Sequence, residues 1–168
     1  ILGSSSKYRA QALRTLGLEL DRDFNQRSPS VDETPKPMES AQAIASRLAL
    51  AKAKEIALNN PGKVIIGSDQ TGVCGDRILE KPGTVEAAIE SLTYCSGKTA
   101  VFYTGLAIYQ TSVQQQNSEG DKYTLDVEAT HLQFRTLTAA QITKYVELDK
   151  PLDCAGAFKA EGLGIALF

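Results

Sequence analysis

The pattern of hydrophobic and polar positions switches along the chain between the period of a helix and that of a strand. Helical spacing is clearest between residues 40 and 59, where Ile44, Leu48, Lys52 and Ile56 recur every four residues on one face. One lysine therefore stands in an otherwise apolar row. Further helices are expected where serine or threonine precedes a run of helical period, at residues 7–16, 84–94 and 138–146.

Apolar runs bounded by turn residues predict strands. The run that begins at Lys63 ends in Gly67-Ser68-Asp69-Gln70, so we expect a covered strand that stops at Asp69. Open α/β sheets place their sites at the carboxyl ends of strands, which makes Asp69 a candidate for chemistry. Gly-Ser-Asp is also ordinary turn composition, and that interpretation stands beside the first. Other strands are expected at residues 1–2, 77–80, 98–111 and 123–134, and after Gly164, and an extended stretch is expected up to about residue 24.

Strands and helices that alternate in this way predict a mixed α/β fold. With 168 residues, the chain is long enough for one compact domain, which we expect to have two lobes. A proline-rich loop, residues 28–37, carries Asp32 and Glu33 between structured elements. A second loop, rich in Ser, Gln, Asn and Gly, connects the strands expected at 98–111 and 123–134.

Composition narrows the classes of function. The net charge of −2 provides no basic field for a nucleic-acid backbone, although 18 Lys and Arg leave room for a local phosphate site. The three cysteines, Cys74, Cys95 and Cys154, form no CxxC pair, and His131 is the sole histidine, so neither zinc nor a disulfide framework is expected. We interpret the cysteines as buried and structural, which fits a cytoplasmic protein. No run approaches the roughly 20 apolar residues of a membrane span.

Two groups of residues can carry chemistry. Ser4, Ser5 and Ser6 precede the first helix, and with Arg9 they can form an anion site, although three serines can also serve only as a cap. Glu33 and Asp69 can together hold a hard cation such as Mg²⁺, although Asp32-Glu33 can equally be a solvated loop. The lysines Lys52, Lys81 and Lys159 are ambiguous in the same way, because each can extend to solvent or point into a cleft.

The chain contains, in this order, Leu2-Gly3-Ser4 through Arg9, Val31-Asp32-Glu33-Thr34, Arg47-Leu48-Ala49 with Lys52-Ala53, Gly67-Ser68-Asp69-Gln70, Lys81-Pro82, Tyr103-Thr104-Gly105, and Cys154-Ala155-Gly156 through Glu161-Gly162. This ordered set resembles the Maf-like nucleoside triphosphate pyrophosphatases over essentially all 168 residues. The resemblance implies a single Maf-like domain over residues 1–168, in a fold related to inosine triphosphate pyrophosphatases: a mixed twisted sheet flanked by helices, with two lobes around a central cleft. It also implies that the family continues past Phe168 with a further loop and helix.

The resemblance implies a reaction and a set of site residues. Family members cleave a nucleotide between the α and β phosphates with a divalent metal, Mg²⁺ or Mn²⁺, and relatives suggest a homodimer. Asp69 resembles the proton acceptor that activates water, and Glu33 and Asp69 resemble the metal ligands. Ser4, Arg9, Lys52 and Lys81 resemble the set that binds and neutralises the phosphates.

Substrate choice in the family is tied to three positions, here Tyr8, Gln70 and Glu161. The branch that cleaves dTTP and UTP usually has Thr where Gln70 stands and Gln where Glu161 stands, so this chain resembles the 7-methyl-GTP branch. An aromatic ring such as Tyr8 can stack on a cationic purine, although that branch often has Trp there, and a carboxylate can accept from the guanine edge. The alternatives are a dTTP/UTP pyrophosphatase and a nucleotide-binding cell-division regulator without turnover.

Overall fold

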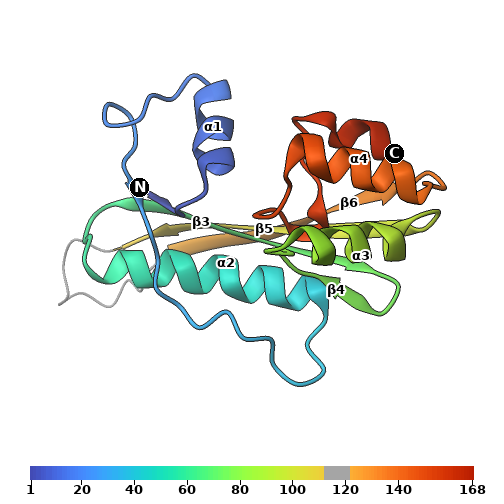
Figure 1. Cartoon of the computed structure of the whole chain (residues 1–168). Coiled ribbons are helices and arrows are strands. Elements are labelled where there is room, and N and C mark those ends of the chain that lie inside the picture. Colours follow the sequence, from blue (N-terminus) through green and yellow to red (C-terminus); the bar gives the residue numbers. More distant parts are fainter. Residues whose placement is uncertain (112–121) are drawn as a thin grey trace. The chain divides into compact units, whose positions relative to one another are not determined.

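A computed structural model describes residues 1–111 and 122–168 of the chain (Figure 1). The polar loop expected between the two long strands falls mainly on residues 112–121, which lie outside the described residues. The helices and strands, in chain order, are β1 (Leu2–Gly3), α1 (Lys7–Thr15), β2 (Gln26–Arg27), α2 (Ala41–Leu58), β3 (Val64–Cys74), β4 (Arg77–Leu79), α3 (Val85–Cys95), β5 (Thr99–Gln110), β6 (Lys122–Gln133), α4 (Ala139–Asp149) and the 3₁₀ helices η1 (Ala155–Ala157) and η2 (Leu163–Leu167).

The strands form one mixed sheet, in the order β2-β1-β3-β5-β6, with β4 paired to β3. β1 is parallel to both β2 and β3, whereas β4 is antiparallel to β3. This architecture confirms the mixed α/β fold predicted from the sequence. The chain divides into two compact units, which consist of Ile1–Gln70 with Thr104–Glu128 and of Thr71–Tyr103 with Ala129–Phe168.

In the first unit, the backbone of α2 approaches the sheet closely at two glycines of the strands. A Cβ atom at Gly67 of β3 would lie 2.3 Å from the Ala49 carbonyl oxygen, and one at Gly105 of β5 would lie 2.3 Å from that of Ala45. Glycine in the strands and alanine in the helix therefore allow the backbones to approach closely. Ser40 caps α2 by accepting a hydrogen bond from the backbone N–H of Ala43, at 3.2 Å. The helix is thus fixed both along its length and at its start.

The second unit has its own hydrophobic core. Helix α3 packs against α4 and η1, and the buried cluster includes Leu92, Phe134 and Val146. The rings of Phe134 and Phe158 meet edge to face, at 6.0 Å between centroids. Helix α4 begins with the predicted capping box, because Thr138 and Gln141 bond reciprocally to each other's backbone N–H.

Three predictions of extended structure are wrong. β3 does not stop at Asp69 but continues to Cys74, because its later residues gain a new antiparallel partner, β4. The stretch up to about residue 24 is mostly turn, with an isolated bridge between Leu20 and Phe24, and the strand β2 follows it. The strand expected after Gly164 is instead the 3₁₀ helix η2.

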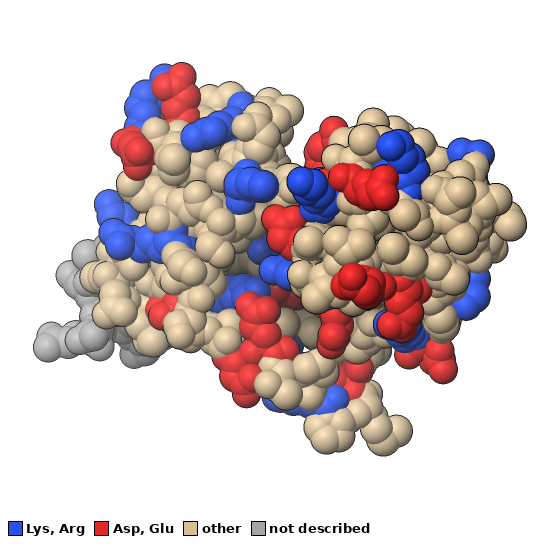
Figure 2. Space-filling view, in the orientation of Figure 1, with Lys and Arg blue, Asp and Glu red and all other residues tan. Residues whose placement is uncertain are grey.

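The surface mixes charges of both signs. On the face that Figure 2 shows, acidic and basic side chains of the described residues are interspersed. Within the described ranges, no helix combines the length and the apolar character that a membrane span requires. The expectation that the protein binds no nucleic-acid polymer stays a prediction.

Candidate active site

A lysine of the first unit lies between two carboxylates. Lys52, on α2, places its Nζ 2.6 Å from Oδ1 of Asp69 on β3 and 2.6 Å from Oε1 of Glu33. The side chains of Lys52 and Asp69 are only 8% and 9% exposed, whereas that of Glu33 is 60% exposed. Burial of a charged pair requires close contact of this kind, since an unpaired ion would lose its hydration. The lysine in the apolar row of α2 therefore does not extend to open solvent.

The pairing of strands explains why Asp69 belongs to this group. In the parallel pair of β1 and β3, Gly3 is opposite Gly67, and β1 ends there. Asp69 comes two residues later in β3, level with the chain that leaves β1 towards α1. The rule that sites lie at carboxyl ends of strands thus applies to β1, the short neighbour, rather than to β3 itself.

The turn that follows β1 is held by side chains. The hydroxyl of Ser4 is buried and accepts hydrogen bonds from Arg9 Nη1 at 3.0 Å and from the backbone N–H of Ser6 at 3.1 Å. Ser6 is the N-cap of α1 and accepts from the backbone N–H of Arg9. Gln26 of β2 donates to the carbonyl oxygens of Ser4, at 2.7 Å, and Ser6, at 3.2 Å. The turn therefore has a defined geometry at the positive end of α1.

Electrostatics connects this turn to the carboxylates. Burial lowers the pKa of the Arg9 guanidinium below its ordinary value, while the charges of Asp69 and Glu33 act in the opposite direction. Arginine stays protonated at any physiological pH even so. The structure therefore brings five predicted residues into one group in the first unit: Ser4, Arg9, Glu33, Lys52 and Asp69.

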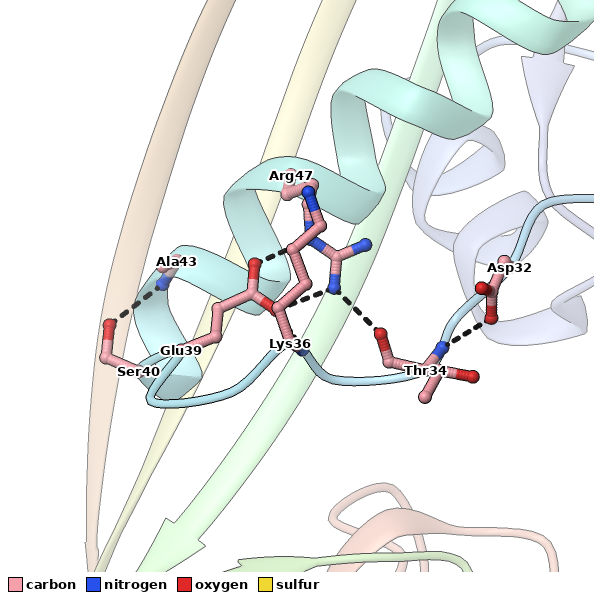
Figure 3. A network of polar contacts seen from close by, with 7 residues as sticks. All are labelled: Asp32, Thr34, Lys36, Glu39, Ser40, Ala43 and Arg47. Atoms are coloured by element: carbon pink, nitrogen blue, oxygen red, sulfur yellow. Dashed lines mark hydrogen bonds and ion pairs between the residues drawn. The ribbon is translucent and has the colours of Figure 1, made fainter.

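The loop that carries Glu33 is tied to α2 (Figure 3). Arg47 donates from Nε and Nη2 to the two carboxylate oxygens of Glu39, at 2.6 and 2.7 Å. Its Nη2 also donates to the carbonyl oxygen of Thr34, at 3.2 Å. Asp32 Oδ1 accepts from the backbone N–H of Thr34, and Glu39 Oε2 accepts from that of Lys36, both at 2.9 Å. Asp32-Glu33 is thus part of an anchored loop.

Two of the predicted specificity residues also belong to the first unit. Gln70 directly follows Asp69, is exposed, and donates from Nε2 to the hydroxyl of Thr104 at 3.0 Å. Tyr8 lies in the first turn of α1, one residue before Arg9, with the ammonium of Lys7 5.2 Å from its ring centroid. Their sequence positions place both beside the group of five.

Lys81 and Glu161 belong to the second unit, and both are exposed. Lys159, which the sequence leaves ambiguous, donates from Nζ to the carbonyl oxygens of Asp149 and Lys150, at 2.7 and 3.1 Å. A cation in this position satisfies the carbonyl end of α4. Lys159 therefore has a structural role.

The prediction of buried cysteines is correct for two of the three. Cys74 and Cys95 are buried, and burial, together with the neighbouring Cys74, raises the pKa of the Cys95 thiol to about 12. Such a thiol stays protonated and unreactive. Cys154 is only partly buried, because it precedes the short η1 helix rather than lying in a sheet or helix of the core.

Sequence reasoning assigned no role to Gln26, Glu39 or Arg47. Gln26 shows no local signal, since its two acceptors lie more than 19 residues earlier in the chain. Arg47 belongs to a motif that the sequence shares with the family, but its partners, Glu39 and Thr34, are set by the path of the loop. The hydrogen bonds of Gln26 and of Arg47 therefore join parts of the chain that local sequence patterns do not relate to each other.

The donor set for a metal consists of oxygen atoms. In the part of the chain that the structure describes, no group of three or more His, Cys, Asp or Glu side chains gathers in a way that could hold a metal ion. Glu33 and Asp69 supply two carboxylates, and each has a second oxygen besides the one that meets Lys52. Two carboxylates with water and phosphate oxygens are a set that Mg²⁺ accepts. The residues fit a metal that is held jointly with a substrate.

Comparison with known proteins gives consistent matches over the whole chain. The profile of the family described as "Maf-like protein" matches residues 1–168. A relative from Idiomarina loihiensis named 7-methyl-GTP pyrophosphatase is 46% identical over 170 residues, which cover 100% of this chain and 80% of the relative. Proteins of the same name from Nitrosococcus oceani and Alcanivorax borkumensis are each 44% identical, covering 99% and 100% of this chain and 78% and 80% of the relatives.

Proposed function

Because the chain belongs to the Maf family, we propose that it is a nucleotide pyrophosphatase that hydrolyses 7-methyl-GTP to 7-methyl-GMP and pyrophosphate. The observation that carries the proposal is the position of Lys52, 2.6 Å from both Glu33 and Asp69, beside the turn of Ser4 and Arg9. Relatives named 7-methyl-GTP pyrophosphatase support the choice of substrate.

The turn after β1 binds the phosphates in this proposal. The N-terminal amides of α1, the hydroxyl of Ser4 and the Arg9 guanidinium are donors, and the positive end of the helix favours an anion. Lys52 adds an ammonium that the two carboxylates hold in place. These groups are fixed before the substrate arrives, so they stabilise charge on the triphosphate without reorganisation.

Asp69 acts as the proton acceptor. It takes a proton from a water molecule, whose oxygen forms a bond to the α phosphorus while the bond from that phosphorus to the bridging oxygen of the β phosphate breaks. The electron pair leaves with pyrophosphate, and the nucleoside monophosphate keeps the oxygen of the water. Lys52 neutralises the charge that moves onto the phosphate oxygens during this step.

A count of charges supports a divalent metal, Mg²⁺ or Mn²⁺. The two cations Arg9 and Lys52 balance the two carboxylates Glu33 and Asp69, so these four groups offer no net positive charge to a triphosphate. Glu33 and Asp69 would hold such a metal, which would supply activation of water and neutralisation of phosphate charge. Removal of the metal with EDTA is therefore expected to abolish turnover, and added Mg²⁺ or Mn²⁺ to restore it.

Recognition of the base is assigned to Tyr8, Gln70 and Glu161. Tyr8 stacks on the cationic purine, and the carboxylate of Glu161 accepts from guanine N1–H and N2–H₂. The contact with Thr104 supports the assignment of Gln70, because it holds that side chain in one orientation next to Asp69. The roles of Lys81, as a further phosphate-binding cation, and of Glu161 rest on the sequence.

The test is pyrophosphate release from 7-methyl-GTP, GTP, dTTP and UTP by the wild-type protein and by Glu161→Gln. We expect the highest kcat/KM for 7-methyl-GTP, and in Glu161→Gln a loss of at least about tenfold for the guanine nucleotides but not for dTTP or UTP, equivalent to 1.4 kcal/mol. A preference for dTTP or UTP would support the pyrophosphatase activity but refute the proposed preference for 7-methyl-GTP. Absence of release from every nucleotide would refute the enzyme and favour the binding-protein alternative.

The proposal also covers where the protein acts and in what state. We place it in the cytoplasm, where it removes modified nucleotides from the pool, and as a homodimer, as the family resemblance implies. The three cysteines are free thiols in the structure, which agrees with a reducing compartment. Light scattering of the purified protein tests the oligomeric state.

A further inference from the structure

Glu33 needs support that the secondary structure does not provide. Residues 28–40 contain neither helix nor strand, so no backbone ladder fixes this part of the chain. The side chain of Glu33 is 60% exposed, and packing therefore does not hold it in place. Its carboxylate nevertheless reaches within 2.6 Å of the Lys52 ammonium. Something outside the residue itself must determine where the loop runs.

Arg47 is the group that joins this loop to the helix. Its guanidinium binds both carboxylate oxygens of Glu39 and also the carbonyl oxygen of Thr34, the residue next to Glu33. Figure 3 shows Arg47 extending from α2 towards the loop, with Glu39 and Thr34 around its guanidinium. The planar guanidinium suits three bonds in fixed directions, and a lysine cannot reproduce them.

Helix α2 carries both Arg47, which binds the loop, and Lys52, which the Glu33 carboxylate contacts. Arg47 and Lys52 are five residues apart on it, a rise of about 7.5 Å along the axis. The same rigid element therefore positions the Thr34 carbonyl and the ammonium that Glu33 meets. We infer that Arg47, through its fork with Glu39 and its bond to Thr34, is a positioning residue that sets the Glu33 carboxylate against Lys52.

The strength of the Arg47–Glu39 pair agrees with this role. The side chains are 24% and 10% exposed, less than those of an ordinary surface pair, and the bidentate geometry is the favourable one. The hydrogen bond from Arg47, and then that from the Lys36 amide, lowers the pKa of Glu39 to about 2. The pair therefore stays charged over the whole physiological range of pH.

The experiment uses Arg47→Lys, which keeps the positive charge but loses the bidentate hydrogen bonds to Glu39. The matched control is Arg77→Lys, because Arg77 pairs with Glu90 at 2.8 Å in the second unit, and neither residue has a role in the site. Amide hydrogen exchange by NMR, without any ligand, should be at least about fivefold faster at Thr34 and Lys36 in Arg47→Lys, with α2 unchanged. The control variant should exchange like the wild type at both amides.

Activity then shows whether Arg47 acts through Glu33, a step that rests on the proposed function. We expect Arg47→Lys to lower kcat for 7-methyl-GTP about tenfold, with KM within threefold, because Ser4, Arg9 and Lys52 are untouched. In a Glu33→Gln background the same substitution should change kcat by less than twofold. A melting temperature close to that of the wild type confirms that each variant is folded.

Any other result would contradict a specific step of the inference about Arg47. Unchanged exchange at Thr34 and Lys36 would show that Arg47 does not hold the loop. Faster exchange with an undiminished loss of kcat in the Glu33→Gln background would show that Arg47 does not act through Glu33. If the wild-type protein released no pyrophosphate, the proposed function would fail, while the exchange rates would still decide whether Arg47 positions the loop that carries Glu33.

Discussion

The ammonium nitrogen of Lys52 lies 2.6 Å from Oδ1 of Asp69, in a pair whose two side chains are almost completely buried. The lysine in the apolar row of α2 and the carboxylate in the buried strand β3 thus compensate each other's charge. Glu33, whose side chain is more exposed, contacts the same nitrogen. The three charges form one group, and the effect of removing each member depends on what the other two retain.

Lys52→Met should destabilise the protein more than Asp69→Asn does. Without Lys52, the buried Asp69 carboxylate loses its cation, and breaking such a pair costs about 3 kcal/mol. Without the Asp69 charge, Lys52 still has Glu33 as a partner. Urea denaturation of the two variants measures the difference in the free energy of unfolding. Equal losses would show that Glu33 does not compensate for Asp69.

Gly67→Ala should disturb both the stability and the site. A Cβ there would lie 2.3 Å from the Ala49 carbonyl oxygen and 2.7 Å from the Ala53 nitrogen, both backbone atoms of α2. Backbone cannot rotate away as a side chain can, so we expect a loss of about 3 kcal/mol, at the upper end for overpacking. Because α2 carries Lys52, catalysis should fall as well. A variant of wild-type stability, measured by thermal unfolding, would contradict the close approach.

The Arg47–Glu39 pair predicts how stability depends on acid. The pKa of Glu39 is lowered from 4.5 to about 2 in the folded protein. A depressed carboxyl pKa contributes stability that is fully present above the unfolded value and is lost as pH falls through the folded value. The stability advantage of the wild type over Glu39→Gln should therefore shrink between pH 4.5 and about 2.

Urea midpoints for the wild type and Glu39→Gln, measured at several pH values in that window, check this prediction. A constant difference between the two proteins across the window would show that Glu39 does not titrate as the pair requires. Glu90→Gln is the control, because Glu90 pairs with Arg77 on the exposed surface of the second unit, away from the Arg47 loop.

The helices could be predicted from the sequence because their signals are local. Ser40, Thr84 and Thr138 each precede a helix, and each accepts the capping hydrogen bond that its residue type suggests. The spacing of α2 also identified Lys52 as unusual. These inferences need only residues within a few positions of one another.

The environment of Asp69 could not be predicted in the same way. That β3 continues to Cys74 depends on its pairing with β4, and that the site lies at the end of β1 depends on a parallel partner more than 60 residues away. The fork of Arg47 is similar, since its bond to Thr34 follows from the path of an irregular loop. Residue types indicate which charges exist, but the fold decides which of them meet.

Hydrolysis of 7-methyl-GTP in H₂¹⁸O by the wild-type protein and by Asp69→Asn, with mass analysis of both products, tests both the site of cleavage and the role of Asp69. Attack on the α phosphorus predicts one ¹⁸O in 7-methyl-GMP and none in pyrophosphate. Loss of the proton acceptor predicts a rate at least about 100-fold lower, with nucleotide binding retained. Label in pyrophosphate, release of orthophosphate, or an Asp69→Asn protein as fast as the wild type would contradict the account.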